Sequence, residues 1–518
     1  MSLGTRRLMV MALLLIAVTG GLLRLALRAE PVALPDAPPG RFACVSYTPF
    51  YHSGESPLDP MARISPARIE ADLAALSRRF DCVRTYSVGQ GMDQVPTIAA
   101  RHGMQVLLGI WLGRDPLANA REIALGIATA RAHPGGIRAI VVGNEVLLRG
   151  ELPASAIAAD LDRVRAATGL PVTYADVWEF WLRHPQLAAH VDFVTVHILP
   201  YWEDDPVAVG RAVQHVAAVV DQVRAAFPGK PVLIGETGWP SRGRVRQAAV
   251  PSRVNEARFV REFLIYARQT HVPYNLIEAF DQPWKRRLEG TVGGYWGLYN
   301  DARQPKFPLH GPVVEDPQAW RALLPATLLA LAFALPALRR RRRPEQALRA
   351  LAGFGVGLAL AAAWQQLADG ARSTLEWSVG CTALMAMLAS AWMLTTALAN
   401  GFDRALTATT ARRLSRLRFG WLLALAWLDL LLVFDPRYRD LPLALVAPAA
   451  LGFALLRITG QPPATPRADC RPQLLALGAA LLAAIIVLQE RGLDPWAWAW
   501  LGLNLLLGSS LWRIRRAI

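Results

Sequence analysis

Short apolar runs alternate with longer, alanine- and arginine-rich stretches of helical character between residues 41 and 310. Most of the short runs are continuously apolar, as expected of parallel strands that are buried on both faces. Eight such runs in a region of this length predict an α/β fold of the (β/α)8 TIM-barrel class. A doubly wound open sheet is the alternative, but no glycine-rich phosphate loop follows the first run. The predicted strands are 42–50, 82–88, 105–113, 139–146, 171–177, 193–200, 231–238 and 274–283.

Longer apolar runs flank this region and predict membrane-spanning helices. Residues 8–27 are long enough to span, follow Arg6 and Arg7, and show no small-residue cleavage site, which favours a retained signal anchor. After His310, an α-helical transmembrane bundle of about seven helices is predicted at 322–338, 347–367, 377–399, 420–434, 441–458, 473–489 and 496–512. The predicted regions are a cytoplasmic tip and anchor (1–30), a proline-rich linker (31–40), a barrel domain (41–318) and a membrane domain (319–518).

The formal net charge of +16 raises the question of nucleic-acid binding. In residues 320–518, however, 22 arginines outnumber 10 acidic residues and lie between apolar runs. This pattern is typical of a topology signal rather than of a phosphate-binding surface. It predicts a multi-pass protein of a bacterial inner membrane that contacts the lipid bilayer, has a periplasmic barrel and binds no nucleic acid. The arginines assigned to the inner side lie in loops 339–343 and 401–419 and at Arg457, Arg467, Arg471, Arg513, Arg515 and Arg516.

The four cysteines show no spacing typical of a metal site. Cys44 and Cys82 fall in the first and second predicted strands, which are neighbours in a barrel. Two buried free thiols are the preferred interpretation, and a disulfide is the alternative if this region is exported. We predict neither a metal site nor a cofactor.

Two glutamates stand where a barrel enzyme carries its catalytic groups, at the C-terminal ends of strands. The fourth predicted strand ends with Asn144 and Glu145, and the seventh ends with Glu236. Two facing carboxyl groups suit glycoside hydrolysis, in which one protonates the leaving oxygen and the other attacks the anomeric carbon. Structural ion pairing is the alternative for either glutamate alone.

Five sequence segments stand out in order along residues 41–310. They are Arg84-Thr85-Tyr86, Val142-Gly143-Asn144-Glu145, His197-Ile198-Leu199-Pro200-Tyr201, Gly235-Glu236-Thr237-Gly238-Trp239-Pro240 and 278–285. With these segments the region resembles glycoside hydrolase family 17, the family of β-1,3-glucanases and glucanosyltransferases. The last segment is more similar to the fungal and bacterial branch than to the plant branch. The resemblance implies a TIM barrel in which Glu145 is the general acid/base, Glu236 is the nucleophile and Asn144 bonds the sugar 2-hydroxyl.

Four polar side chains near these strand ends are candidates for orienting the nucleophile or binding sugar. We expect Arg84 and Tyr86 to orient Glu236 or to contact the substrate; a structural salt bridge is the alternative for Arg84. Tyr201 is expected to hydrogen-bond the nucleophile. For His197, a role in the site and a satisfied core position are weighed equally.

Two aromatic and two charged residues complete the predicted substrate-binding set. Trp239 follows Glu236, and Trp284 follows the last strand. Exposed aromatic rings stack on sugar faces, and Trp284 is the better candidate for such a platform. Asp281 and Lys285 are expected either to bind sugar hydroxyls or to pair with each other.

The preferred function is a β-1,3-glucan glucanosyltransferase, because a membrane-anchored enzyme is well placed to extend or branch a nascent β-1,3/β-1,6-glucan made by a glucan synthase. A β-1,3-glucan hydrolase shares the same mechanism, with water as the final acceptor. A non-catalytic glucan-binding scaffold is the alternative from another class. In a third interpretation the membrane region carries the main function, exporting glucan or organising a synthase, although it contains few polar residues. Asp429 lies in the predicted span 420–434, where an acidic residue has either a functional role or a structural partner.

Overall fold

The computed structural model describes residues 3–338, 343–401, 405–436, 439–459 and 470–511. By its internal contacts the chain divides into two compact units. One, the barrel unit, comprises residues 32–242 and 249–313. The other, the helical unit, comprises residues 1–31, 243–248 and 314–518. Of the arginines predicted to lie on the inner side, those at 339–342, Arg404, Arg467, Arg513, Arg515 and Arg516 lie outside the described residues.

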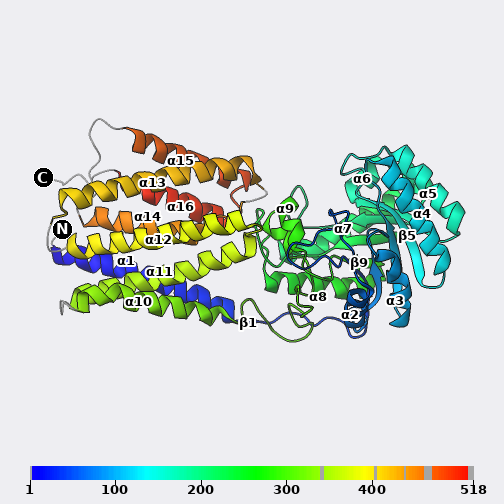
Figure 1. The fold of residues 1–518 in the computed structure, drawn as a ribbon, viewed down its shortest axis with the longest axis horizontal. Helices are drawn as coiled ribbons and strands as arrows, with labels where there is room; N and C mark the ends of the chain where they lie inside the picture. The colour runs from blue at the N-terminus through cyan, green and yellow to red at the C-terminus, as the bar shows by residue number, and fades with distance from the viewer. Residues whose placement is uncertain (1–2, 339–342, 402–404, 437–438, 460–469, 512–518) are drawn as a thin grey trace. The chain divides into compact units, whose positions relative to one another are not determined.

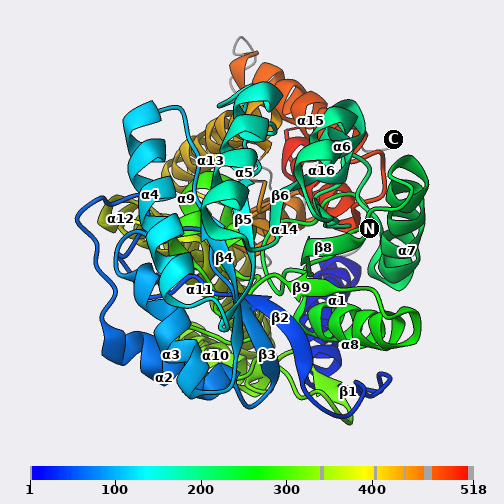
Figure 2. The same cartoon turned by 90° about the vertical axis from the view of Figure 1, so that its right-hand side faces the viewer.

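Eight parallel strands close into a barrel in the order β2 to β9, which confirms the predicted fold class. Every strand pairs with the next one along the chain, and β9 pairs with β2. The helices of this unit surround the strands in Figure 2. The strands are β2 (Phe42–Ser46), β3 (Phe80–Arg84), β4 (Gln105–Ile110), β5 (Ile137–Asn144), β6 (Val172–Val177), β7 (Val194–His197), β8 (Val232–Thr237) and β9 (Tyr274–Leu276).

The eight strands lie at the predicted places, but the first and the last are shorter than the apolar runs that suggested them. After Ser46 the chain leaves the sheet, and the hydroxyls of Tyr47 and Tyr51 donate hydrogen bonds to buried Asp72. After β9, the backbone N–H of Glu278 donates to the carbonyl of Trp296 instead of continuing the barrel. The apolar runs therefore predicted which of these residues are buried. Where each strand ends depends on the partners of the backbone hydrogen bonds.

Three helices of the barrel unit begin at recognisable capping residues. Ser65, Asp115 and Ser252 each accept a backbone N–H of the first turn with the side chain. The helices are α2 (Pro66–Leu76), α3 (Val95–Arg101), α4 (Pro116–Ala132), α5 (Ala154–Thr168), α6 (Trp178–Arg183), α7 (Val209–Ala226), α8 (Arg253–Thr270) and the short α9 (Arg286–Glu289). A separate two-stranded sheet pairs β1 (Pro31–Val32) with β10 (Val313–Val314).

Cys44 and Cys82 form a disulfide that joins β2 and β3. The two residues are direct partners in the strand register, and both lie among buried apolar side chains such as Leu107 and Leu233. The preferred interpretation of two free thiols was therefore wrong. Such a bond requires a short distance between the two Cα atoms, which is 4.4 Å here. The sequence had placed the cysteines in neighbouring strands without giving their register.

Each of the eight apolar spans predicted in the sequence coincides with a helix of the helical unit. Among the described residues, six helices are long and apolar enough to cross a membrane, and Leu443–Ile458 is a shorter apolar helix. Figure 1 shows the helices of this unit running beside one another. They are α1 (Leu3–Ala29), α10 (Leu323–Leu338), α11 (Arg343–Gly370), α12 (Thr374–Gly401), α13 (Ala408–Phe434), α14 (Leu443–Ile458), α15 (Arg471–Gln489) and α16 (Pro495–Ser509).

Asp429 lies fully buried on α13 within this helical unit. Its Oδ1 accepts a hydrogen bond of 2.5 Å from the indole nitrogen of Trp500 on α16. The carboxyl group thus has a partner inside the bundle, which is the structural alternative weighed for it in the sequence.

Candidate active site

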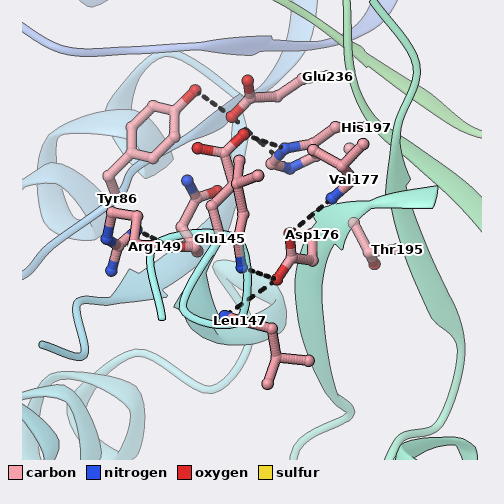
Figure 3. Close-up of polar contacts among 12 residues, drawn as sticks. Tyr86, Glu145, Leu147, Arg149, Asp176, Val177, Thr195, His197 and Glu236 are labelled. Carbon is pink, nitrogen blue, oxygen red and sulfur yellow. Dashed lines mark hydrogen bonds and ion pairs between the residues drawn. The ribbon is translucent and has the colours of Figure 1, made fainter. Parts of the chain in front are cut away.

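Glu145 and Glu236 both lie at the C-terminal end of the barrel, on strands that are not neighbours. Glu145 directly follows β5, and Glu236 is the penultimate residue of β8. The chain turns sharply after β5: Gly143 has φ 86° and Glu145 has φ 53°. A Cβ at position 143 would approach Val146 to 3.0 Å, so glycine suits both the backbone conformation and the space. The turn directs the Glu145 side chain toward His197 and Glu236 (Figure 3).

The Glu236 carboxylate is 4% exposed and is held by two donors. Its Oε1 accepts hydrogen bonds of 2.8 Å from Arg84 Nη1 and of 2.8 Å from the Tyr86 hydroxyl. Burial by itself would raise the pKa of Glu236, but the positive charges of His197, Arg84 and Lys285 outweigh it and hold this pKa below its usual value. The lowered pKa favours the ionised form of Glu236, which is the form that a nucleophilic role requires.

His197, on β7, lies between the two carboxylates. Its Nδ1 is 3.1 Å from Glu145 Oε1, and its Nε2 is 3.6 Å from Glu236 Oε1. One ligand atom from each of these three residues lies within 4.8 Å of the other two. Figure 3 shows the three side chains pointing toward one another. This closeness of the carboxylates is that of a retaining glycosidase rather than of the wider inverting arrangement.

The same three residues form the one group of histidine and acidic side chains, within the described residues, whose geometry could hold a metal ion. Arg84 already donates to Glu236 Oε1, and its guanidinium is 1% exposed. A fixed cation at this oxygen disfavours the approach of a second cation. The arrangement therefore suits proton transfer and nucleophilic attack better than metal binding.

Asn144 connects the Glu236 side of the site to the Glu145 side. Its Oδ1 accepts a hydrogen bond from Arg84 Nη2, the guanidinium that also holds Glu236. Behind this contact, buried Asp176 on β6 accepts the backbone N–H groups of Leu147 and Leu148 at 3.2 and 3.4 Å. Asp176 thus fixes the turn that carries Glu145. The sequence analysis did not identify Asp176, although its place at the end of a predicted strand was the available signal.

Tyr201 and Trp239 belong to a buried aromatic cluster beside the site. Trp239 is 1% exposed, and its indole N–H donates to the carbonyl of Val250 at 3.1 Å. Tyr201 is fully buried and makes edge contacts with Trp239 and Trp296. The structure therefore places these two predicted residues in the wall that supports the site, without an exposed ring face.

Asp281 and Lys285, which follow β9, each pair with another residue rather than with each other. Lys285 Nζ contacts Glu278 Oε2 at 2.9 Å, and Asp281 Oδ1 contacts Lys306 Nζ at 2.9 Å. Burial raises the pKa of Glu278 to about 7. Trp284 is half-buried and donates its indole N–H to Gln282 Oε1 at 2.7 Å. The positive charge of Lys285 is one of those that lower the pKa of Glu236, after His197 and Arg84.

Comparisons with known proteins match the barrel. Residues 44–297 match the family described as the BtgE/BtgC glycoside hydrolase domain. A probable beta-glucosidase, btgE, of Aspergillus fumigatus is 27% identical over 265 residues, or 49% of this chain. The glucan 1,3-beta-glucosidase of Saccharomyces cerevisiae is 24% identical over 272 residues, which is 47% of this chain and 85% of the yeast protein. The match spans only 45% of the length of the Aspergillus protein.

Solved structures match the same part of the chain. The glycoside hydrolase family 17 β-1,3-glucanosyltransferase of Rhizomucor miehei is 25% identical, with a TM-score of 0.46 over 52% of this chain and 98% of that one. An active-site mutant of the Rhizomucor miehei enzyme, in complex with laminaritriose, is 26% identical with the same TM-score, over 53% of this chain and 98% of that one.

Proposed function

Because residues 44–297 form a BtgE/BtgC glycoside hydrolase domain, we propose that this protein is a retaining enzyme acting on β-1,3-glucan. We further propose that it transfers glucan chains to sugar acceptors, making or branching β-1,3/β-1,6-glucan. The observation that carries this proposal is the close approach of Glu145 and Glu236, with His197 between them and Arg84 and Tyr86 on Glu236.

In the first step, a Glu236 carboxylate oxygen attacks the anomeric carbon while Glu145 donates a proton to the departing glycosidic oxygen. The bond between that carbon and oxygen breaks, and a glycosyl ester forms on Glu236. Arg84 and Tyr86 orient the carboxylate for the attack, since both contact its Oε1 at 2.8 Å. Asn144 is positioned to bond the sugar 2-hydroxyl, an interaction that strengthens in the transition state.

In the second step, Glu145 accepts a proton from the incoming hydroxyl, whose oxygen attacks the anomeric carbon and releases Glu236. A sugar hydroxyl gives transfer, and water gives hydrolysis. The glucosidase names of the curated relatives favour hydrolysis as the second candidate. Placement of the enzyme at a membrane, beside newly made glucan, favours transfer.

The barrel domain (41–318) is proposed to face the periplasm of a bacterial inner membrane, with residues 1–30 as anchor, 31–40 as linker and 319–518 as membrane domain. The Cys44–Cys82 disulfide supports an oxidising compartment for the barrel. Six helices with the length and composition of membrane spans support contact with a lipid bilayer. A glucan synthase that supplies nascent chains is the proposed protein partner.

The test uses the full chain purified in detergent and incubated with laminari-oligosaccharides, with the products separated by size. Products longer than the starting sugar, absent with Glu236→Gln, are expected. Shorter products alone would replace transfer by hydrolysis. Binding of the sugar without any product from the folded wild-type protein would contradict the enzymatic proposal and favour the scaffold.

A further inference from the structure

Trp111 is the one exposed tryptophan in the described residues of the barrel unit. It directly follows β4 at the catalytic end of the barrel, and 39% of its surface is accessible. The other tryptophans of this unit are buried or half-buried. Large aromatic surfaces exposed near a site are characteristic of ligand contact.

The Trp111 ring is exposed but held in place. The guanidinium carbon of Arg149 lies 4.2 Å from the ring centroid and so covers one face of the indole. Arg149 is itself fixed, because its Nε and Nη2 donate to Glu151 Oε2 at 2.9 and 2.7 Å and its Nη2 also donates to the carbonyl of Leu112 at 2.8 Å. One face of the ring is therefore covered, and the orientation of the ring that carries the remaining accessible surface is set in advance, which lowers the entropy cost of binding.

The same arginine ties Trp111 to the turn of the acid/base residue. Arg149 Nη1 donates to the carbonyl of Asn144, and the Arg149 backbone N–H donates to the carbonyl of Glu145 at 2.9 Å. In the sheet, Ile110 pairs with Val142, so Trp111 is level with Gly143, two residues before Glu145 on the adjacent strand. The indole therefore stands on the Glu145 side of the site.

We propose that Trp111, held by Arg149, is a stacking platform for a glucose unit of the β-glucan chain outside the unit that reacts with Glu236. The inference rests on the proposed function and identifies one specific binding position for it. A pyranose ring in the β-configuration presents a flat face of C–H groups, which packs on the open face of an indole while the ring hydroxyls stay in water. No polar partner for the sugar is required at this position, so the platform selects for chain length rather than for linkage.

The experiment measures KM and kcat of the full chain in detergent for laminaribiose and for a longer laminari-oligosaccharide. For Trp111→Ala, KM for the longer sugar is expected to rise about tenfold, while KM for laminaribiose and both kcat values change little. Trp111→Phe, which keeps a stacking ring, restores most of the loss. Leu117→Ala, at an exposed position on the first turn of α4, is the matched control and leaves all values unchanged.

Two outcomes would overturn the platform. One is an unchanged KM for the longer sugar in Trp111→Ala. The other is an equal loss of kcat for both sugars, which would mean that the indole only supports the Asn144 turn through Arg149. Calorimetric binding of the longer sugar to Glu236→Gln, with and without Trp111→Ala, separates this inference from the proposed function. Binding that depends on Trp111 supports the platform even if the wild-type protein forms no product, whereas turnover without this dependence supports the function alone.

Discussion

The imidazole Nδ1 of His197 lies 3.1 Å from Oε1 of Glu145. The other ring nitrogen faces Glu236 at 3.6 Å, so one side chain from β7 contacts both carboxylates of the site. Because its positive charge helps to keep the pKa of Glu236 low, and because it orients Glu145, its removal disturbs both halves of the reaction. We predict that His197→Ala lowers kcat/KM for laminari-oligosaccharides about a hundredfold. His133→Ala, at a half-buried histidine that contacts Thr97, serves as control in the same steady-state assay. A loss of less than about threefold would remove His197 from the working site.

The roles of the two glutamates predict opposite anomers when azide replaces the missing group. In Glu236→Gly, azide takes the place of the carboxylate and attacks an activated aryl β-glucan directly, so an α-glycosyl azide is expected. In Glu145→Gly, the ester on Glu236 still forms from the activated substrate, and azide then gives a β-glycosyl azide. The anomeric configuration is read from NMR coupling constants. The reverse pattern would exchange the roles of the two residues.

The charge of Lys285 is predicted to set the acid side of the pH profile. Burial raises the pKa of Glu236, whereas His197, Arg84 and Lys285 lower it to a net value below normal. Replacing Lys285 with Gln removes one positive charge, so the pKa of Glu236 rises. The acid limb of kcat/KM then moves to higher pH, because a higher pH is needed to ionise the nucleophile. Lys230→Gln, whose ammonium group donates to the carbonyl of Val191, is the control with no expected shift.

Glu256 on α8 makes the stability of the barrel depend on pH. Burial raises the pKa of Glu256 to about 8, although Lys306 lies 3.1 Å from its carboxylate. An acid whose pKa is raised on folding favours the folded state most at low pH, and that contribution is lost as the pH rises through the folded pKa. We therefore predict that the melting temperature of the wild type falls between about pH 5 and pH 9, and that it falls less in Glu256→Gln.

The control for this pH series is Glu70→Gln, because Glu70 is solvent-accessible and Arg101 lowers its pKa. Glu70→Gln should therefore show the same fall of the melting temperature over this pH range as the wild type. Parallel melting curves for Glu256→Gln and the wild type would show that Glu256 does not titrate in the folded barrel.

The disulfide between Cys44 and Cys82 is predicted to stabilise the barrel. It closes a loop with a sequence separation of 38 residues, and loops of this size contribute about 2–4 kcal/mol through the lost entropy of the unfolded chain. The double change Cys44→Ala and Cys82→Ala should lower the melting temperature in the absence of reductant. Cys381→Ser, which removes an exposed free thiol, should leave it unchanged. An unaltered melting temperature of the double variant would mean that the thiols are not joined in the native protein.

Several features were accessible from the sequence because they depend on local patterns. Continuous apolar runs located all eight strands, because parallel strands that are buried on both faces consist mostly of apolar residues. Barrel topology then placed Glu145 and Glu236 at one end, because all parallel strands finish at the same end. The helices of the helical unit followed from the length of their apolar runs alone.

Which oppositely charged side chains form ion pairs was decided only by the tertiary structure. Lys285 and Asp281 are close in sequence and of opposite charge, yet each pairs with another residue, Glu278 and Lys306 respectively. A flexible charged side chain selects among several candidates by geometry that barrel closure creates, and sequence proximity does not encode that choice.

Exposure of the aromatic residues was decided in the same way. Trp239 looked like a sugar platform by its position after the nucleophile, and it lies buried against the carbonyl of Val250. Trp111 was not singled out, and it is exposed with Arg149 on one face. The sequence by itself determined which residues reach the catalytic end of the barrel. Which of them face solvent, and which support the others, depended on packing between segments far apart in the chain, because burial belongs to the surroundings of a residue and not to the residue.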